Sequence, residues 1–366
     1  MANDIYVTFR KDYGYHRQFS FPFVIHGALA ESLGNPNPLV MRILSGIQPT
    51  GILHIGNYFG MMRPAIALQE SEGNETFYFI ADYHALTTIA NPETLRANSR
   101  QVALDFLACG LDVTRNALFR QSDVPEVTEL TWILSTVTPK GLLERAHSYK
   151  DKVARGLPAS AGLFTYPVLM AADILIYDSD LVPVGKDQKQ HLEMTRDMAM
   201  KFNETFGSEP DGQIFKLPQP QIQAATETVP GVDGQKMSKS YGNTIDIFGD
   251  EKETRKRIMS MVTDSKPVEA PKDAASSTIF QLYSLLATPA ETEEMRGRFE
   301  KGGSGYGDFK KQLFEKLWSY FEPMRKRREE ILKDPGYIDV VLERGAARAN
   351  EEAGKVMKRV RAAVGL

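Results

Sequence analysis

The sequence holds one cysteine, Cys109, among its 366 residues. A single thiol cannot form a disulfide within the chain, and it excludes a CxxC metal site and a cysteine-ligated iron–sulfur cluster. No apolar run reaches the roughly 18 residues that a membrane span needs. We therefore expect a globular protein of the reducing cytoplasm with no structural metal and no membrane contact.

Neither positive nor negative charge is in large excess. Lysine and arginine number 44 against 47 aspartates and glutamates, for a net charge of −3. No global positive field attracts nucleic acid, so any such contact must come from local basic clusters. The basic clusters at residues 255–257 and 325–328 suit phosphate contact, and a solvated helix face is the alternative for each. The length allows two domains, each with its own core.

Residues 45–57, SGIQPTGILHIGN, are the stretch around which the rest is organised. An apolar segment precedes it and helical spacing follows, which predicts a strand, a tight turn and a helix start. His54 and Asn57 stand three apart and share a face of the first helical turn, beside unpaired N–H groups that suit phosphate. The pattern indicates a nucleotide site, and an ordinary strand-to-helix turn with a buried histidine is the alternative.

Strands and helices alternate through the first two thirds of the chain, which predicts an α/β fold with a Rossmann-like, doubly wound parallel sheet. The expected domains are a dispensable extension at 1–40, a catalytic domain at 41–247 with a helical insert at about 125–180, and a helical region at 248–366. We expect the last helix to pack back on the catalytic domain. The predicted strands lie at residues 42–44, 76–80, 117–119 and 181–185, and residues 207–235 read as loop.

A second informative stretch, GQKMSKSYG, spans residues 234–242. Lys236 and Lys239 stand three apart on a glycine-flanked loop, so both ammonium groups can reach one polyphosphate. A loop can close after a nucleotide binds and open again to release product. Taken alone, a run of lysine and serine is more typical of a solvated loop.

Together the two stretches resemble a known family. HIGN at residues 54–57 resembles the HIGH signature, and KMSKS at 236–240 is the full second signature, of class I aminoacyl-tRNA synthetases. The sequence is most similar to the bacterial tryptophan-specific branch, through residues 45–51, 170–173, 182–188 and 262–265. The departures are Asn57 in place of the last histidine, Lys186 where an acid is commoner, and Leu44 where a phenylalanine can line the indole pocket.

The resemblance implies that ATP, carried with Mg²⁺, binds at the two signatures. The catalytic residues it implies are Lys236, Lys239, His54 and Lys152, which would surround the phosphates. The ATP-binding residues it implies are Gln48, Pro49, Thr50, Gly56, Asn57, Gly185, Lys186, Asp187, Val229, Lys236, Met237, Ser238, Lys239 and Ser240. The reaction needs no enzyme nucleophile, because the substrate carboxylate attacks the α-phosphate.

The amino-acid pocket is expected on a helix read at residues 161–177. Tyr166, Met170 and Asp173 share one face of it, and a core helix with a salt-bridged aspartate is the alternative. Under the resemblance, Met170 faces the indole and Asp173 accepts the indole N–H, where tyrosine-specific relatives carry glutamine at the position of Met170. A carboxylate left unpaired would then reject phenylalanine by roughly 10⁴ to 10⁵. The residues implied to bind tryptophan are Tyr166, Met170, Asp173, Val182, Val184 and Gln188, with Tyr166 and Gln188 holding its ammonium.

The implied function is ATP-dependent activation of L-tryptophan and its transfer to tRNA(Trp) by a cytoplasmic homodimer, and the resemblance implies that the helical region at 248–366 binds the anticodon. The apolar run at residues 157–177 is expected to supply the dimer surface. A tyrosine-specific relative remains open, as does a small nucleotidyltransferase, which would not need the helical region. A non-catalytic regulator that binds tRNA or tryptophan is the alternative from another class, and it would be expected to lack Lys236 and Lys239.

Overall fold

The computed structural model describes residues 41–70, 73–146, 149–150, 154, 156, 160–184, 188–207, 213–222 and 229–366. All of them belong to one unit, Val40–Leu366. The expected extension at residues 1–40 lies outside the described residues. Within the described ranges, no helix is both long enough and apolar enough to cross a membrane.

A parallel sheet forms the centre of the described chain, and its strands run in the order β3-β2-β1-β4-β5. The chain therefore starts in the middle of the sheet, winds to one edge and then crosses β1 to build the other side. This topology confirms the predicted doubly wound α/β fold. The strands are β1 (Arg42–Ile47), β2 (Glu75–Ile80), β3 (Ala117–Arg120), β4 (Leu181–Val184) and β5 (Gln219–Ile222).

The edge strand β5 was not predicted, because its residues fall within the stretch read as loop. Its sequence, QPQI, has neither an apolar run nor alternation. Pro220 lies opposite Val182 in the ladder between β4 and β5. Proline cannot donate a backbone hydrogen bond, so a strand that contains it is tolerated only at an edge, which is where β5 lies. Pairing with β4, rather than local pattern, creates this strand.

Side chains of β2 alternate between two cores, one on each face of the sheet. Phe77 and Phe79 join a core with α5, α8, α9 and α15, whereas Tyr78 and Ile80 join a core with α4 and the C-terminal helices. Burial on both faces explains why β2 reads as a nearly continuous apolar run. The helices before the C-terminal region are α1 (Ile55–Asn57), α2 (Arg63–Ala67), α3 (Asp82–Ala85), α4 (Pro92–Ala108), α5 (Glu126–Val137), α6 (Lys140–Leu143), α8 (Ala161–Leu175) and α9 (Lys189–Phe206).

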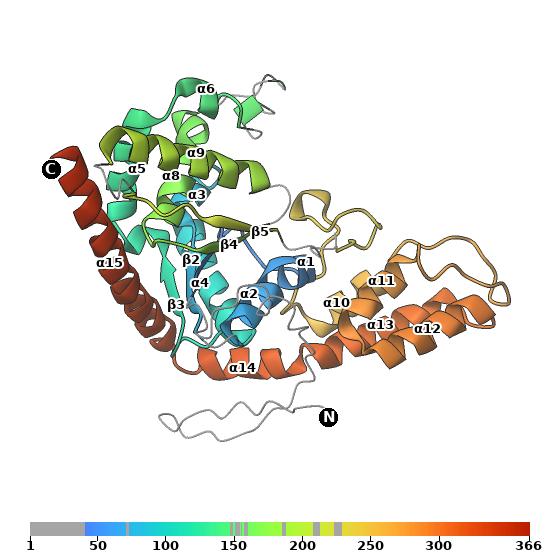
Figure 1. Ribbon diagram of the computed structural model, residues 1–366. Coiled ribbons are helices and arrows are strands. Elements are labelled where there is room, and N and C mark those ends of the chain that lie inside the picture. The colour runs from blue at the N-terminus through green and yellow to red at the C-terminus, as the bar shows by residue number, and fades with distance from the viewer. Residues whose placement is uncertain are drawn as a thin grey trace. The chain divides into compact units, whose positions relative to one another are not determined.

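From residue 251 on, the regular secondary structure is helical, as predicted, with a non-helical stretch at residues 260–277 between α10 and α11. The four-residue repeat of Phe309, Leu313 and Leu317 lies on α13, and all three side chains are buried. In Figure 1, α10 to α13 extend to the right of the sheet, while α15 runs along its left side. The C-terminal helices are α10 (Glu251–Met259), α11 (Thr278–Leu286), α12 (Pro289–Lys301), α13 (Tyr306–Tyr320), α14 (Glu322–Leu332) and α15 (Tyr337–Val364).

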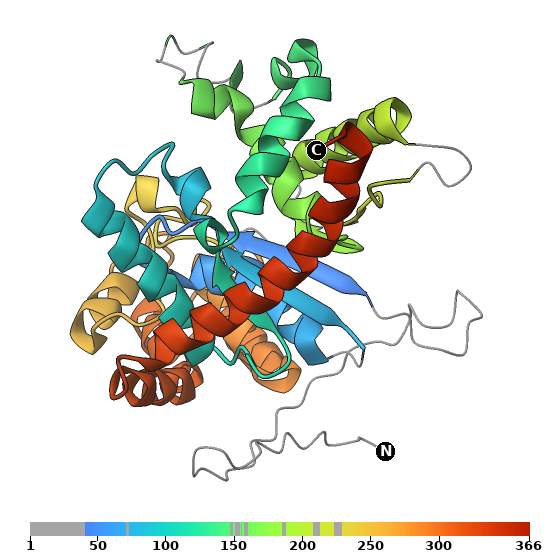
Figure 2. The same ribbon diagram turned by 90° about the vertical axis from the view of Figure 1, so that its left-hand side faces the viewer.

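The last helix, α15, packs across β3 and α5 (Figure 2). Gly345 makes the close approach possible, because a Cβ at this position would lie 2.0 Å from the carbonyl oxygen of Leu118. Arg361 adds a salt bridge to Glu129 of α5. The C-terminal helix thus covers the edge strand β3. Its first half, with Val341 and Leu342, joins the core on one face of the sheet, and its second half, with Val356, joins the core on the other.

Candidate functional site

The candidate site lies at the carboxyl edge of the sheet, where β1 and β4 run side by side. The strand order reverses between these two strands, and open parallel sheets bind ligands at such a point. The HIGN turn follows β1, helix α3 follows β2, and Gln121 follows β3 directly. Three consecutive strands therefore deliver polar side chains to one edge.

The HIGN turn is fixed by reciprocal hydrogen bonds between His54 and Asn57. The backbone N–H of Asn57 donates to His54 Nδ1 at 3.3 Å, and the backbone N–H of His54 donates to Asn57 Oδ1 at 3.1 Å. This capping pair opens α1. The predicted helix then continues as a π-helix, Tyr58–Met62. Such π-helical turns are frequent at functional sites.

His54 is neutral at physiological pH. Burial, followed by the positive charge of Lys239, lowers the pKa of the imidazole to about 4. The ring thus contributes a hydrogen-bonding group and no charge. The dependence on Lys239 also indicates that the two signature stretches lie close together in space.

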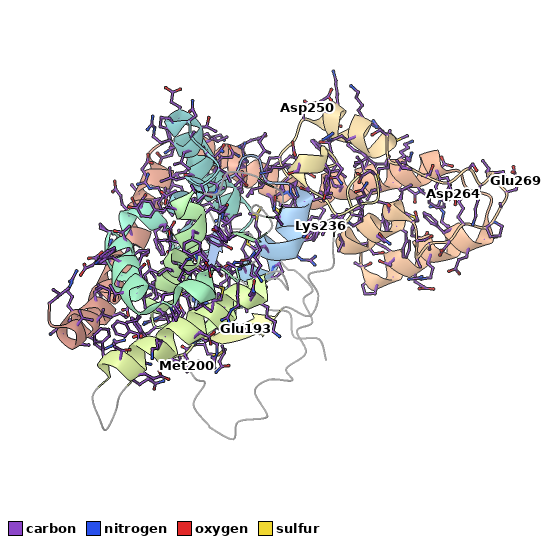
Figure 3. The ribbon with its side chains drawn as sticks, turned by 90° about the horizontal axis from the view of Figure 1, so that it is seen from above. Glu193, Met200, Lys236, Asp250, Asp264 and Glu269 are labelled. Atoms are coloured by element: carbon purple, nitrogen blue, oxygen red, sulfur yellow. The ribbon has the colours of Figure 1, made fainter. Side chains whose placement is uncertain are left out.

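Direct packing joins the KMSKS loop to the HIGN turn. A Cβ added to Gly56 would lie 2.9 Å from His54 Nδ1 and 3.3 Å from Met237 Cβ, so only glycine leaves room for both neighbours. Lys239 Nζ lies 3.6 Å from the position that a Cβ of Gly51 would occupy. The ammonium group therefore lies against the turn after β1, and Lys236 sits on the same loop (Figure 3).

Asn243 organises the KMSKS loop, although nothing in the sequence analysis singled it out. Its Oδ1 accepts the N–H of Ser238 at 2.8 Å, while its Nδ2 donates to the carbonyl of Lys236 and to Asp233. Burial lowers the pKa of Lys239, and the carboxylate of Asp246 opposes that shift. Lys236 and Lys239 are both exposed residues on this scaffold, although the turn after β1 partly shields the Lys239 side chain.

Asp173 forms the buried end of the expected amino-acid pocket. Its carboxylate accepts a hydrogen bond from His84 Nε2 at 2.8 Å and hydrogen bonds from Gln121 Nε2 at 2.7 and 2.9 Å. The side chain is 2% exposed. Burial raises the pKa of this carboxyl group, and the bonds from His84 and Gln121 oppose the rise. Gln121 is a site residue that the sequence analysis missed; its place directly after β3 was the available signal.

The predicted face of α8 is present. Tyr166 and Met170 are half-buried on the same helix as Asp173. The Tyr166 hydroxyl contacts His191 Nε2, a partner that the sequence did not indicate. Val182 is buried in β4, and Gln188 lies half-buried at the start of α9.

Some of the remaining predicted residues are described by the structure, and the others lie outside the described ranges. In the turn after β1, the N–H of Thr50 donates to the carbonyl of Gln48 at 2.9 Å, with Pro49 buried between them. Val229 is buried, and its carbonyl accepts the N–H of Met237. Ser240 is exposed beside Lys239. The predicted residues Lys152, Gly185, Lys186 and Asp187, and the side chain of Val184, lie outside what the structure describes.

The basic cluster at residues 325–328 is largely engaged within the chain. Arg328 Nε lies 3.2 Å from the buried carboxylate of Asp105, and the Arg325 guanidinium stacks 3.7 Å over Trp318. In the cluster at 255–257, Arg255 lies over Phe314 and Arg257 donates to the carbonyl of Gly242. Several of these arginines thus have a structural role.

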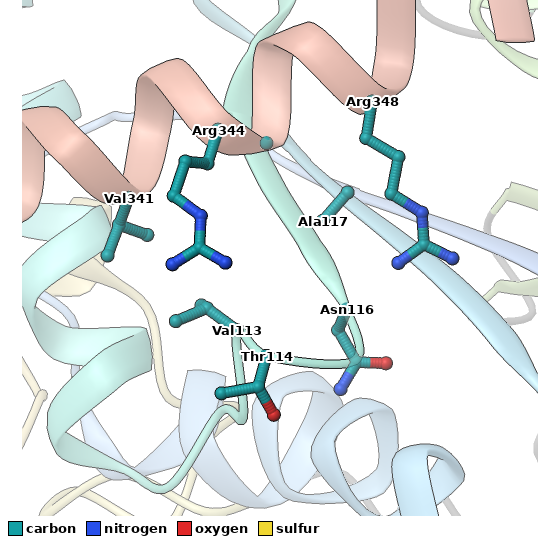
Figure 4. Close-up of a pocket in the computed structure, with 8 residues that line it drawn as sticks. Val113, Thr114, Asn116, Ala117, Val341, Arg344 and Arg348 are labelled. Atoms are coloured by element: carbon teal, nitrogen blue, oxygen red, sulfur yellow. The ribbon is translucent and has the colours of Figure 1, made fainter. Parts of the chain in front are cut away.

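A separate cavity of about 100 Å³ opens between α15 and the loop before β3 (Figure 4). Arg344 and Arg348 extend over it from α15. Arg348 already donates to the carbonyl of Arg115 and to Glu75. Ala117, at the beginning of β3, lines the cavity, so it lies at the amino edge of the sheet, opposite the candidate site.

Comparison with known proteins agrees with this geometry. The family model described as tRNA synthetases class I (W and Y) matches residues 39–322. The chain is 56% identical to a tryptophan–tRNA ligase of Rhodopirellula baltica over 89% of this chain and all of that one. It is 53% identical to one of Fusobacterium nucleatum, over 89% of this chain and 98% of that one.

A solved structure of tryptophanyl-tRNA synthetase from Campylobacter jejuni, complexed with ADP and tryptophan, superimposes with a TM-score of 0.82 at 49% identity. The match covers 89% of this chain and all of that one. The resemblance predicted from the HIGN and KMSKS stretches is confirmed. The chain belongs to the class I aminoacyl-tRNA synthetases and, within them, to the tryptophan–tRNA ligases.

Proposed function

We propose that this chain activates L-tryptophan with ATP to form tryptophanyl-adenylate and transfers the aminoacyl group to tRNA(Trp) in the cytoplasm. The observation that carries the proposal is the contact between the two signatures: Lys239 lies against the turn at Gly51, beside the start of the HIGN helix. A nucleotide held at this edge has its phosphates between a helix start and an ammonium group. Asp173, the expected amino-acid recognition group, is held at the same sheet edge by the hydrogen bond that it accepts from Gln121.

The chemistry requires positioning and charge stabilisation. The tryptophan carboxylate attacks the α-phosphate, the bond to the β-phosphate breaks, and pyrophosphate leaves with the negative charge. Lys236 and Lys239 stabilise that charge as it develops, and the neutral His54 adds a hydrogen bond without a competing charge. Lys152 and the segment 185–187 complete the ATP contacts in this proposal.

Mg²⁺ is proposed to arrive with the phosphates of ATP. Within the described part of the chain, histidine, cysteine, aspartate and glutamate form no group of three that could hold a metal ion. In this proposal the ion would be coordinated by phosphate oxygens, which is how Mg²⁺ commonly binds in nucleotide enzymes. Its charge would add to that of the two lysines on the leaving group.

The tryptophan pocket is proposed to lie along α8. Asp173 accepts the indole N–H, Met170 and Val182 contact the ring, and Tyr166 with Gln188 holds the substrate ammonium. Methionine at position 170 offers a flexible apolar surface that suits an indole better than a phenol. This arrangement favours tryptophan over tyrosine.

The function is tested by ATP–pyrophosphate exchange measured separately with each common amino acid. Exchange supported by tryptophan, and not by tyrosine or phenylalanine, is expected. Exchange with tyrosine would assign the chain to the tyrosine-specific relatives. Tryptophan binding without any exchange would favour the non-catalytic regulator.

A homodimer is proposed, on a different surface from the one expected. Leu163, Val168 and Ile174 of the expected run are buried within the chain, so they offer no surface to a partner. Trp132 on α5, in contrast, is 73% exposed. Such a large exposed aromatic side chain is typical of an interface residue.

The dimer proposal predicts that Trp132→Glu lowers the mass measured by light scattering at micromolar concentration from two chains to one. The charge would be forced into an apolar contact, which should weaken association at least about tenfold. Arg344→Glu, an exposed position on α15, serves as the control that keeps the mass. A single-chain mass for the unmodified protein would reject the proposal.

A further inference from the structure

Gln121 connects two strand ends and the buried carboxylate of Asp173. The side chain is 1% exposed. Its Oε1 accepts the backbone N–H of Tyr83 at 3.1 Å, and its Nε2 donates to both carboxylate oxygens of Asp173 at 2.7 and 2.9 Å. Because one end faces a donor and the other an acceptor, the amide has only one orientation that satisfies both.

The arrangement leaves a defined part of the carboxylate for a ligand. A carboxylate offers about four lone-pair positions. His84 occupies one on Oδ2 at 2.8 Å, and Gln121 shares its donor between Oδ2 and Oδ1. The lone-pair position left for a ligand is therefore on Oδ1, and the Gln121 amide determines which way that oxygen faces.

The same contacts change the expected basis of selectivity. From the sequence alone, Asp173 is expected to be an unpaired buried charge whenever the indole N–H is absent. In the structure, His84 and Gln121 already donate to it. A ligand without the N–H thus loses one charge-assisted hydrogen bond and does not expose an unpaired charge.

We propose that Gln121 is a positioning residue that orients the Asp173 carboxylate to accept the ring N–H of the substrate. The inference rests on the proposed function, in which Asp173 recognises the indole. Gln121 itself does not touch substrate. It converts a carboxylate that could rotate into an acceptor of fixed direction. Asp173 can then accept a hydrogen bond only from a donor at one position of the bound ring.

The test compares tryptophan with 3-benzothienylalanine, in which sulfur replaces the ring N–H, in ATP–pyrophosphate exchange. For the unmodified chain, kcat/KM should favour tryptophan by about 10- to 100-fold, the value of one charge-assisted hydrogen bond. Gln121→Met keeps the length of the side chain and removes the donor. It should bring this ratio to within about threefold of unity, through the KM for tryptophan, with the KM for ATP unchanged.

Gln101→Met is the matched control, because Gln101 Nε2 donates to the carboxylate of Asp105 at 2.8 Å away from the site. It should keep the full ratio. If Gln121→Met does not fold, Gln121→Asn, whose shorter amide cannot reach both partners, is judged by the same ratio.

The outcomes separate the two proposals. A wild-type ratio retained in the Gln121 variants overturns the inference and leaves the role of Asp173 intact. An equal loss with both substrates also overturns it, because a merely structural role would act in that way. A ratio near unity in the unmodified chain rejects the contact between Asp173 and the ring N–H, and with it the positioning role.

Discussion

The Asp173 pocket and the KMSKS loop differ in how firmly their functional groups are held. Asp173 is fully buried, and two side chains from other strand ends donate to it. Lys236 and Lys239 are exposed residues, with Lys239 partly shielded, and hydrogen bonds hold mainly the backbone beneath them. The difference suggests a division of labour. In the proposed function, a rigid pocket would select the amino acid, and ammonium groups on a loop would act when charge moves to the leaving group.

Lys239→Ala should give the largest effect and sharpen this comparison. We expect tryptophan-dependent ATP–pyrophosphate exchange to fall by about 10²- to 10³-fold, because the ammonium acts chiefly in the transition state. The dissociation constant for tryptophan should change by less than about twofold. Lys252→Ala, an exposed lysine on α10, is the control, and equal losses in exchange and tryptophan binding would give Lys239 a different role.

Asp173→Ala should instead weaken recognition of the amino acid. Loss of the acceptor should lower kcat/KM for tryptophan by about 10- to 100-fold and erode the preference over phenylalanine, with the KM for ATP nearly unchanged. The donors of His84 and Gln121 lose their partner, so the unfolding free energy should also drop by about 1–3 kcal/mol. Steady-state exchange and thermal unfolding measure the two effects, and unchanged selectivity would contradict the proposed pocket.

The neutral His54 predicts a pH dependence of stability. Its pKa is about 4 in the folded chain and 6.5 in the unfolded one, so between these values the unfolded state binds more protons. Stability contributed by His54 is therefore present above pH 6.5 and is lost as the pH falls toward 4. His54→Gln, which removes the titrating group, should flatten the unfolding free energy over this range by an amount on the order of 1 kcal/mol. An identical pH profile in the variant would mean that other groups account for it.

Removal of residues 1–40 should give the smallest effect. The strand β1 begins at Arg42, and the segment NPNP at residues 35–38 suits a linker. A chain that starts at Met41 should keep exchange activity within about twofold, since the site elements all follow it. An insoluble or inactive product would show that the extension contributes to the catalytic part.

Local signals predicted most of the fold. Apolar runs located β1 to β4, and the four-residue spacing of Phe309, Leu313 and Leu317 located α13. The strand β5 could not be predicted, because pairing with β4 stabilises it and QPQI carries no strand pattern. The π-helical form of the helix after HIGN could not be predicted either. Apolar spacing predicts a helix and does not distinguish its type.

The candidate site residues that lie in contiguous motifs could be predicted from the sequence. HIGN and KMSKS were recognisable because their residues are adjacent in the sequence. Gln121 and Asn243 were not, because each acts on residues that come close only after folding, such as Asp173 for Gln121. The sequence of the apolar run at residues 157–177 likewise does not reveal that α5 and α9 pack against its helix α8, and the dimer surface expected there stays a prediction.

A double-mutant cycle on exchange activity tests the division of labour most directly. Lys239→Ala, Asp173→Asn and the double variant are compared by kcat/KM for tryptophan, with Asn keeping the shape of the pocket. If the pocket selects and the loop catalyses independently, the fold losses should multiply, with a residual coupling below about 0.5 kcal/mol. A double variant no worse than Lys239→Ala alone would contradict the account, because the two regions would then act as one unit.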